Sequence, residues 1–544
     1  MPSAASAASA HIDSFARERL PPPALMPELL FELPELQFPP RLNCAAELLD
    51  RHIAAGHGER LCIQGAGVRW NYAEFQAQAH RIAHVLVQQM GLVPGNRVLL
   101  RGANTPMLAA CWFAVVKAGG IAVGSMPMLR ARELAAITGK ARISHALCDA
   151  RLAEELALAV PQCPTLQHIA HYGGERLELE TRAAAMPASF NNVDTSADDI
   201  CLMAFTSGTT GVPKGTLHFH RDVMAACACW PMHVLRPTRD DIFIGSPPLA
   251  FTFGLGGLLL FPLAVGASTV LVEKATPETL PAAVEAHGAT VCFTAPTSYR
   301  AIAMAALEGR CTHRMHTLRK CVSAGEALPA ATRALWQQAT GLTLIDGIGS
   351  TELLHIFISA DEAAARPGAT GVPVPGYRAT VLDEAGHELP PGQVGRLAVK
   401  GPTGCKYLDD PRQASYVQHG WNLTGDAYLV DVDGQFVYQA RTDDMLVSGG
   451  YNLAGPEVEA ALLLHPAVAE CAVVGAPDEA RGMVVKAFVV LKPGFEAGDA
   501  LARTLQDFVK QTIAPYKYPR RVVFRSELPR TETGKLQRFL LKNV

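Results

Sequence analysis

The sequence lacks an excess of charge, a paired-cysteine motif and a recognisable targeting segment. Its 544 residues carry a formal net charge of −3, which gives no basic field of the kind that attracts nucleic acid. The 13 cysteines are scattered and form no C-x-x-C motif, which is typical of reduced cytosolic thiols. Residues 1–10 are mostly alanine and serine, without the basic start and apolar core of a signal peptide. We therefore expect a cytoplasmic protein that does not bind nucleic acid.

A membrane span is not expected either. Residues 251–272 are uncharged for long enough to suggest one. However, Pro262 and four glycines interrupt this stretch, and no polar belt flanks its ends. We interpret it as a buried helix followed by a buried strand.

The chain is long enough for two or more domains, and 49% of its residues are hydrophobic. Up to about residue 371, apolar strands alternate with helical segments, which favours parallel sheets with helices on both faces. Short strands with Asp-Gly and Pro-Gly turns follow, and then a compact tail of mixed helix and strand. The sequence predicts an α/β fold: a large N-terminal domain (1–442) of βα-layered sheets with a small barrel-like subdomain, and a small mobile α+β C-terminal domain (443–544).

The first functional motif is a run rich in glycine and hydroxyl residues, Thr206-Ser-Gly-Thr-Thr-Gly-Val-Pro-Lys-Gly215. The other motifs are interpreted in relation to it. A buried strand over 200–205 precedes it, and we expect a helix over 218–230 after it. A strand, such a loop and a helix together cradle polyphosphate, because backbone N–H groups, hydroxyls and a lysine all donate to the oxygens. The run is not a Walker A loop, because Pro213 stands where that motif has glycine. Taken alone, it could be an ordinary surface loop.

Three further motifs follow in order. In the first, Gly349-Ser-Thr-Glu352, we expect a glycine turn and then a helix that begins at Thr351-Glu352, which would form a second anion site with a carboxylate for magnesium. Thr424-Gly-Asp426 leads to a loop that begins at Arg441. The last, Pro529-Arg-Thr-Glu-Thr-Gly-Lys535, places a lysine on a glycine-containing loop. Each motif alone could be a common cap, turn or exposed lysine.

In this order, the four motifs resemble those of the AMP-forming adenylating enzymes, which include the acyl-CoA synthetases. The resemblance spans residues 206–535 and includes the TSGTTGxPKG spelling. It implies a two-step reaction, in which a carboxylate attacks ATP to form an acyl-AMP and a thiol then accepts the acyl group. It also implies ATP, Mg²⁺ and coenzyme A as cofactor and cosubstrates, and a small-molecule acid as the other partner.

The resemblance implies roles for individual residues. Lys535 would supply charge as the α-phosphate is attacked, Thr351 would contact phosphate, and Glu352 would bind magnesium. The ATP and AMP site would comprise Thr206, Ser207, Gly208, Thr209, Thr210, Gly211, Lys214, Gly325, Glu326, Ala327, Asp346, Gly347, Ile348, Asp426 and Arg441. The hinge would be Asp443, and the path of CoA would run along Gly449 and Gly450. In one departure from the family, Ile348 stands where an aromatic residue usually covers adenine.

The acid-binding pocket is expected at Thr252, Phe253, Ala295, Gly349, His355 and Ile356. Residues 346–357 resemble the benzoate-type aryl-CoA ligases, whereas Phe251-Thr-Phe253 and the N-terminal residues 15–23 look more like 2-aminobenzoate–CoA ligases. We therefore predict 2-aminobenzoate as the substrate, with benzoate as the alternative. An ortho-amino group buried without a partner would cost about 1–3 kcal/mol, so Thr252 or His355 should face it.

Other interpretations stay open. The enzyme could load a separate carrier protein instead of CoA, or the chain could be a non-catalytic nucleotide sensor. The oligomeric state is open too, a homodimer included. Five side chains, His218, His220, Cys227, Cys229 and His233, could suggest zinc. We do not predict a site there, because two cysteines two positions apart on a helix point to different faces.

Overall fold

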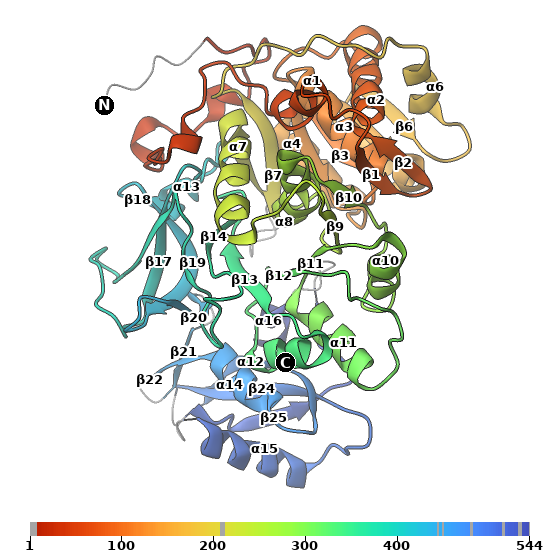
Figure 1. Ribbon diagram of the computed structural model, residues 1–544. Coiled ribbons are helices and arrows are strands. Elements are labelled where there is room, and N and C mark those ends of the chain that lie inside the picture. The colour runs from red at the N-terminus through yellow and green to blue at the C-terminus, as the bar shows by residue number, and fades with distance from the viewer. Residues whose placement is uncertain are drawn as a thin grey trace.

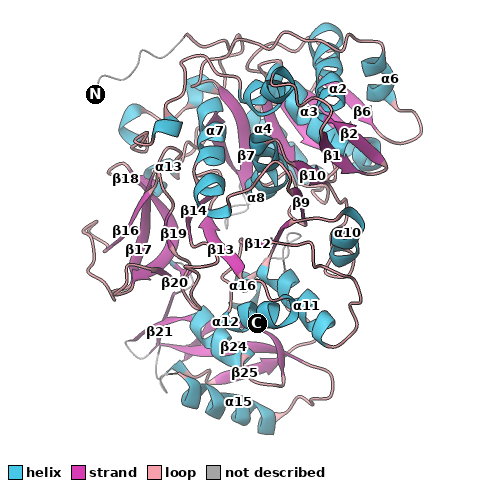
Figure 2. Cartoon of the chain, in the orientation of Figure 1, coloured by secondary structure: helices cyan, strands magenta, loops and turns pink. Residues whose placement is uncertain are grey.

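The computed structural model describes residues 8–206, 213–442, 445–448, 451–478, 482–513, 517–530 and 536–542. Within these ranges, two mostly parallel sheets with helices form a large body, and an antiparallel sheet lies beside it (Figure 1). A smaller unit of helix and strand follows at the C-terminal end, as the colouring by secondary structure also shows (Figure 2). The predicted α/β fold class is confirmed.

The first large sheet has six strands. In spatial order they are β6 (His168–Tyr172), β5 (His145–Asp149), β3 (Arg97–Arg101), β4 (Ile121–Ser125), β7 (Ile200–Thr206) and β8 (Lys214–Phe219). All neighbours are parallel except β7 and β8. The helices of this part are α2 (Tyr72–His84), α3 (Pro106–Lys117), α4 (Ala131–Ala141), α5 (Ala153–Ala159) and α6 (Glu178–Ala184). Local chemistry sets where α3 begins: the Thr105 hydroxyl accepts the Leu108 N–H at 3.2 Å, and Pro106 suits the first helical position.

The second large sheet has nine strands. In spatial order they are β15 (Val372–Pro373), β14 (Ile356–Ser359), β13 (Leu344–Gly349), β12 (Lys320–Ser323), β11 (Val291–Thr294), β9 (Ile242–Gly245), β10 (Ser268–Val270), β1 (Leu61–Gly65) and β2 (Val68–Asn71). The central six are parallel, and both edges are antiparallel. Its helices are α1 (Arg51–Ala54), α8 (Thr252–Leu255), α9 (Phe261–Val265), α10 (Leu280–His287), α11 (Pro296–Leu307) and α12 (Ala330–Thr340). Helix α7 (His220–Ala228) directly follows β8 and packs on β7 and β8 of the first sheet.

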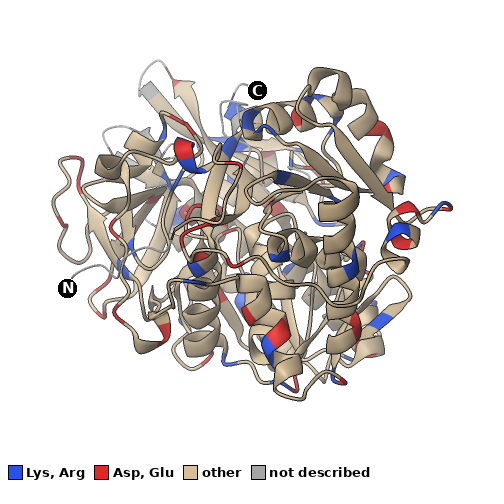
Figure 3. Ribbon diagram, turned by 90° about the horizontal axis from the view of Figure 1, so that it is seen from above, with Lys and Arg blue, Asp and Glu red and all other residues tan. Residues whose placement is uncertain are grey.

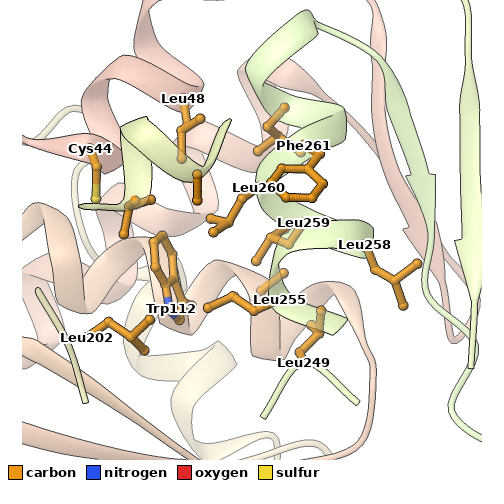
Figure 4. Close-up of a cluster of buried hydrophobic side chains, with 14 of the residues drawn as sticks. Cys44, Leu48, Trp112, Leu202, Leu249, Leu255, Leu258, Leu259, Leu260 and Phe261 are labelled. Atoms are coloured by element: carbon orange, nitrogen blue, oxygen red, sulfur yellow. The ribbon is translucent and has the colours of Figure 1, made fainter. Parts of the chain in front are cut away.

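The uncharged stretch is part of the core. Helices α8 and α9 are joined by a π-helical turn, Gly256–Leu260, and strand β10 follows. Leu255 and Leu258 to Phe261 are at most 3% exposed and pack with Trp112 and Leu202 (Figure 4). The predicted buried helix and strand are confirmed. Among the residues that the structure describes, no helix combines the length and apolarity needed to cross a bilayer.

The remaining sheets are small. The antiparallel unit comprises β16 (Arg378–Leu382), β17 (Gly395–Lys400), β19 (Trp421–Val430), β18 (Val417–Gln418) and β20 (Phe436–Arg441), with the short helix α13 (Gln413–Tyr416). The C-terminal unit comprises β21 (Met445–Ser448), β22 (Tyr451–Ala454), α14 (Gly455–Leu463), β23 (Val468–Asp478), β24 (Gly482–Leu491), α15 (Asp499–Thr512), β25 (Arg521–Phe524) and α16 (Arg538–Lys542). It has its own apolar core around Val458, Leu462 and Val489. Seen from above, basic and acidic residues are interspersed along the ribbon (Figure 3).

Two local predictions are wrong. The segment after the glycine-rich run is not helical from residue 218: strand β8 occupies Lys214–Phe219, and α7 begins only at His220. The run therefore joins two antiparallel strands. Likewise, Thr351 and Glu352 do not open a helix but lie in a turn between antiparallel strands β13 and β14. In both places strand pairing satisfies the backbone, so neither anion site has a helix N-terminus.

Candidate active site

The ends of β7 and β8 hold the glycine-rich run. Thr206 and Lys214 are paired residues on the two strands. The Thr206 hydroxyl is buried without a hydrogen-bond partner, so it can bond to a ligand there. Five of the expected ligands, Ser207, Gly208, Thr209, Thr210 and Gly211, lie outside the described residues.

Lys214, Glu352 and Tyr407 form one cluster. The Tyr407 hydroxyl donates to Glu352 Oε1 at 2.5 Å and accepts from Lys214 Nζ at 2.9 Å. The lysine and the carboxylate are themselves 3.7 Å apart, and the ammonium lies 4.9 Å from the centre of the Tyr407 ring. Burial and the nearby Glu352 carboxylate raise the pKa of Tyr407 well above its ordinary value, so the hydroxyl keeps its proton. The tyrosine thus holds a cation and an anion at fixed positions beside the run.

A buried network lies behind Thr351. His218 Nε2 bonds to the Thr351 carbonyl at 2.9 Å, which ties strand β8 to the turn after β13. The other ring nitrogen of His218 is 3.9 Å from Asp222, and Asp222 pairs with Lys406 at 2.8 Å. Burial lowers the pKa of His218 to about 4. The imidazole is therefore neutral at pH 7 and donates from Nε2, which fixes the turn that carries Thr351 and Glu352.

Asp426 and Arg441 lie on neighbouring strands. They are paired residues of β19 and β20, and Arg441 Nη1 bonds to Asp426 Oδ1 at 3.0 Å. Burial raises the pKa of Asp426, whereas Arg441 opposes that shift. The aspartate also lies close enough to Glu352 for the two charges to interact. Asp426 and Arg441 of the predicted ATP site are therefore brought close to the cluster of Lys214, Glu352 and Tyr407.

Strands β12 and β13 carry the expected adenine-binding segments. Asp346 is 9% exposed, and burial raises its pKa to about 7. Gly347 must be glycine, since a Cβ there would lie 2.7 Å from Ile356. Ile348 is half-buried against the core. Gly325 and Ala327 are exposed in the loop after β12, and Glu326 contacts Arg530 of the C-terminal unit at 3.7 Å.

The expected acid pocket is aromatic. Trp230, Phe253 and Phe261 surround the His355 ring, with centroid distances of 5.6, 5.7 and 4.5 Å. Thr252 is buried next to Phe253, and Ile356 pairs with Gly349 across β13 and β14. Ala295 is the residue before α11, two positions after Phe293, whose ring lies 5.6 Å from that of Phe253. The structure thus brings the predicted pocket residues to one region.

His355 is the unusual member of this pocket. It is 4% exposed, and neither ring nitrogen makes a well-aligned hydrogen bond, although the Phe253 backbone lies close enough to influence its pKa. Burial lowers its pKa to about 3, against a smaller opposing effect of the Phe253 backbone. Gly256 leaves room for the ring, because a Cβ there would lie 2.5 Å from His355 Cδ2. A neutral imidazole without partners is thus enclosed by apolar rings, ready to bond to a polar group on a ligand.

Four further predicted residues, Asp443, Gly449, Gly450 and Lys535, lie outside the described residues. The structure does describe the segments that flank Lys535. Arg530 contacts Glu326 of the N-terminal part, and Arg538 pairs with Glu459 of α14 at 2.8 Å. The described residues on both sides of Lys535 therefore make ion pairs. Arg530, on one side, contacts Glu326 in the segment that the sequence predicts to bind the nucleotide.

Sequence reasoning missed two residues of the site. Tyr407 belongs to no motif that we recognised, and it reaches the site through an isolated bridge to Thr216 on β8. His218 was considered only as a metal ligand, although it bonds to the Thr351 carbonyl. The alternation of Leu217 and Phe219 with Thr216 and His218 could have revealed a strand, with His218 on the face opposite to the two apolar side chains.

Comparisons with known proteins agree with this geometry. The AMP-binding enzyme family matches residues 50–407, and the AMP-binding enzyme C-terminal domain matches residues 457–535. The chain is 36% identical to a benzoate–CoA ligase of Thauera aromatica over 517 residues, which is 94% of this chain and 98% of that protein.

Two solved structures are also similar. One is the anthranilate CoA ligase AuaEII in complex with anthranoyl-AMP, with a TM-score of 0.89, 34% identity and coverage of 94% of this chain and 98% of that chain. The other is a benzoate CoA ligase from Burkholderia xenovorans LB400, with a TM-score of 0.84, 32% identity and coverage of 92% and 100%.

The two layered sheets match the fold of an adenylating enzyme, and the chain belongs to the AMP-binding enzyme family. Within that family it is an AMP-forming acid–thiol ligase of the benzoate and aminobenzoate type. The family resemblance read from the sequence is confirmed.

Proposed function

We propose that the protein is a 2-aminobenzoate–CoA ligase. The observation that carries the choice of acid is His355, a buried imidazole without partners inside an aromatic pocket. Aromatic side chains suit a flat ring, and an ortho-amino group beside the imidazole would satisfy one of its nitrogens. Thr252 is the second polar side chain at this end of the pocket. Benzoate would fill the same pocket but would leave His355 unsatisfied.

In the first half of the reaction, the carboxylate of the acid attacks the α-phosphate of ATP. The aryl-AMP forms, and pyrophosphate leaves. Lys214 and the run at 206–215 would hold the β- and γ-phosphates, which depart. Thr351 and Lys535 would contact the α-phosphate, where charge increases in the transition state. Asp426 would accept from the ribose hydroxyls, with Arg441 fixing its orientation.

Magnesium fits the residues at Glu352. The Tyr407 hydroxyl occupies one carboxylate oxygen, Oε1, and leaves Oε2 for a cation. The Thr206 hydroxyl has no hydrogen-bond partner and lies on the same side of the β7–β8 hairpin as Lys214. Lys214 in turn donates to the Tyr407 hydroxyl. Bound there, magnesium would supply positive charge to the phosphate oxygens. Glu352 would be its protein ligand.

In the second half of the reaction, the thiol of CoA attacks the aryl-AMP carbonyl and releases AMP. Lys535 and the incoming thiol need the same side of the adenylate, so the C-terminal domain, residues 443–544, would turn about Asp443. Gly449 and Gly450 would then line the path of the thiol. We expect the enzyme to act in the cytoplasm, where ATP and CoA are available.

Acid-dependent exchange between ATP and pyrophosphate tests this proposal. We expect exchange with 2-aminobenzoate to exceed exchange with benzoate, 4-aminobenzoate and fatty acids, because only the ortho-amino group would reach His355. The variants Thr252→Ala and His355→Ala should lower the ratio of kcat/KM for 2-aminobenzoate over benzoate. An unchanged ratio in both variants would refute the assigned contact, and a preference for benzoate in the native enzyme would refute the assigned acid.

Assays on the same purified protein distinguish the proposed function from two others. Thioester formation with CoA, compared with an aryl carrier protein, distinguishes a CoA ligase from a loading enzyme. A nucleotide sensor would show no acid-dependent exchange at all. The joint presence of Lys214, Glu352, Asp426 and Lys535 argues against a sensor, since a sensor needs no residue for the transfer step.

A further inference from the structure

A cluster of two thiols and an imidazole lies at the end of the β7–β8 hairpin that is opposite to the phosphate loop. Cys201 is on β7, His220 directly follows β8, and Cys44 precedes the helical segment 46–54. Cys44 is at the left margin of the apolar cluster in Figure 4. All three residues are at most 1% exposed. Among the residues that the structure describes, they are the three whose potential metal-binding atoms lie within 4.8 Å of one another.

The distances suit a metal ion. Cys44 Sγ lies 3.9 Å from Cys201 Sγ and 3.2 Å from His220 Nδ1. In a tetrahedral zinc site, bonds of about 2.3 Å to sulfur and about 2.0–2.1 Å to nitrogen place the ligand atoms about 3.5–3.8 Å apart. Shifts of a few tenths of an ångström would therefore convert this cluster into three corners of such a site.

Buried polar atoms around the cluster have no partners. His220 Nε2 has none, and neither does either ring nitrogen of His11, which is 9% exposed. His11 is held close by, because the preceding residue, Ala10, donates its N–H to Asp199 at 2.9 Å and Asp199 accepts the His220 N–H at 3.1 Å. The charges of His11 and His220 interact. Such orphaned nitrogens next to two thiols call for a ligand.

The hydrogen bonds within the cluster would be exchanged for bonds to the ion. Cys44 Sγ now donates to Cys201 Sγ at 3.9 Å, and a metal ion bound by both sulfurs would replace that contact. At present His220 Nδ1 accepts the Cys44 N–H at 3.1 Å, and a metal ion would take over that lone pair.

We propose that Cys44, Cys201 and His220 bind one Zn²⁺ ion, and that a ring nitrogen of His11, which now lies outside the 4.8 Å cluster, moves in to complete the coordination. Two zinc–sulfur and two zinc–nitrogen bonds form, and the two thiols release up to two protons to the solvent. The ion joins the N-terminal segment, the residues around Cys44 and the open end of the β7–β8 hairpin, opposite to the phosphate loop. The proposal is independent of which acid the enzyme uses.

The cysteines and histidines that we weighed from the sequence were a different set. Of those five, only His220 belongs to the cluster, because the other ligands come from residues 44 and 201, far away in the sequence. Such a set is visible only once the fold brings the segments together.

Cobalt substitution of the purified full-length enzyme tests the proposal. After treatment with a chelator, titration with Co²⁺ should give one equivalent of a visible band of tetrahedral cobalt and a thiolate-to-cobalt charge-transfer band. Zn²⁺ should displace both bands, and Zn²⁺ alone should raise the Tm. The variants Cys44→Ala and Cys201→Ala should weaken binding at least about 10- to 100-fold. His11→Ala should weaken it less and alter the visible band.

Cys321→Ala is the matched control. Cys321 and Cys292 are paired residues on β12 and β11, buried like the cluster, and Cys292 faces Tyr299 instead of a histidine. This variant should keep the cobalt spectrum. The native protein alone can refute the proposal, because absence of a stoichiometric cobalt band overturns it whether or not the variants fold. A band that persists in Cys44→Ala and Cys201→Ala, or formation of a disulfide in place of metal binding, also overturns it.

Discussion

Removal of one hydroxyl, in Tyr407→Phe, should disable the adenylation step while leaving the fold intact. That hydroxyl bonds to Glu352 at 2.5 Å and to Lys214 at 2.9 Å. Phenylalanine keeps the ring and its contact with the ammonium, so the change removes only the bridge. Glu352 and Lys214 would lose the group that sets their separation.

The size of the effect follows from the two bonds. A hydrogen bond to a charged group contributes about 1.5–3 kcal/mol. Lys214 and Glu352 are 3.7 Å apart and can approach each other once the hydroxyl is gone, which recovers part of the loss. We therefore expect the transition state of adenylation to lose about 1.4–2.7 kcal/mol, or about 10- to 100-fold in kcat/KM for ATP.

Exchange of pyrophosphate into ATP measures this step directly. Tyr407→Phe should also need more Mg²⁺ for half-maximal exchange, because Glu352 is no longer oriented. Thioester formation from supplied aryl-AMP should change little. Tyr299→Phe is the control, since it removes a buried tyrosine hydroxyl that bonds to the Cys292 carbonyl at 2.9 Å, away from the site. Exchange within twofold of the native rate, or an equal loss in both variants, would refute the reasoning.

Three further predictions concern the cap and the acid pocket. Lys535→Ala should abolish aryl-AMP formation but spare thioester formation from supplied aryl-AMP; equal loss of both half-reactions would contradict a turning cap. Gly256→Ala should weaken binding of the acid by about 1–3 kcal/mol, since its Cβ would lie 2.5 Å from His355 Cδ2, whereas Gly139→Ala, with open space around the Cβ, should leave kcat/KM unchanged. The folded pKa of His355, about 3, lies below its ordinary value of 6.5, so the unfolded chain binds the extra proton and stability falls as pH drops from about 6.5 towards 3. Between pH 7 and pH 5, the free energy of unfolding in urea should therefore fall by about 2 kcal/mol less in His355→Leu than in the native protein. Equal losses in the two proteins would show that His355 is already protonated or exposed.

Much of the fold could be predicted because its strands are short, apolar and buried on both faces. Strands β4, β11 and β12 are examples, because nearly all of their residues are buried. In each, a continuous apolar run ends at a glycine, proline or polar turn, and local chemistry is sufficient. The buried segment 251–265 was likewise predictable, since Pro262 and the glycines of this segment argue against a membrane span.

The errors occurred where distant strands pair. Lys214–Phe219 has helical residues after it, and nothing local shows that it lies antiparallel to β7. Similarly, β14 pairs with β13 and so converts the expected helix at Thr351 into a turn. Tyr407 could not be assigned, because its role depends on bonds to residues 55 and 193 positions away in the sequence. The order of the motifs predicted which residues belong to the candidate site. How these residues are arranged in space became visible only from the pairing of strands in the structure.

The hairpin that carries the phosphate loop has a consequence for the release of product. A loop at a helix N-terminus adds the field of the aligned peptide dipoles to its grip on phosphate. Antiparallel strands have almost no net dipole, so under the proposed function the positive charge beside the loop would come from Lys214 and from a bound cation. Such binding would weaken once the cation left with the pyrophosphate. A loop of this kind therefore suits an enzyme that must discard two of the three phosphates that it binds and retain the third.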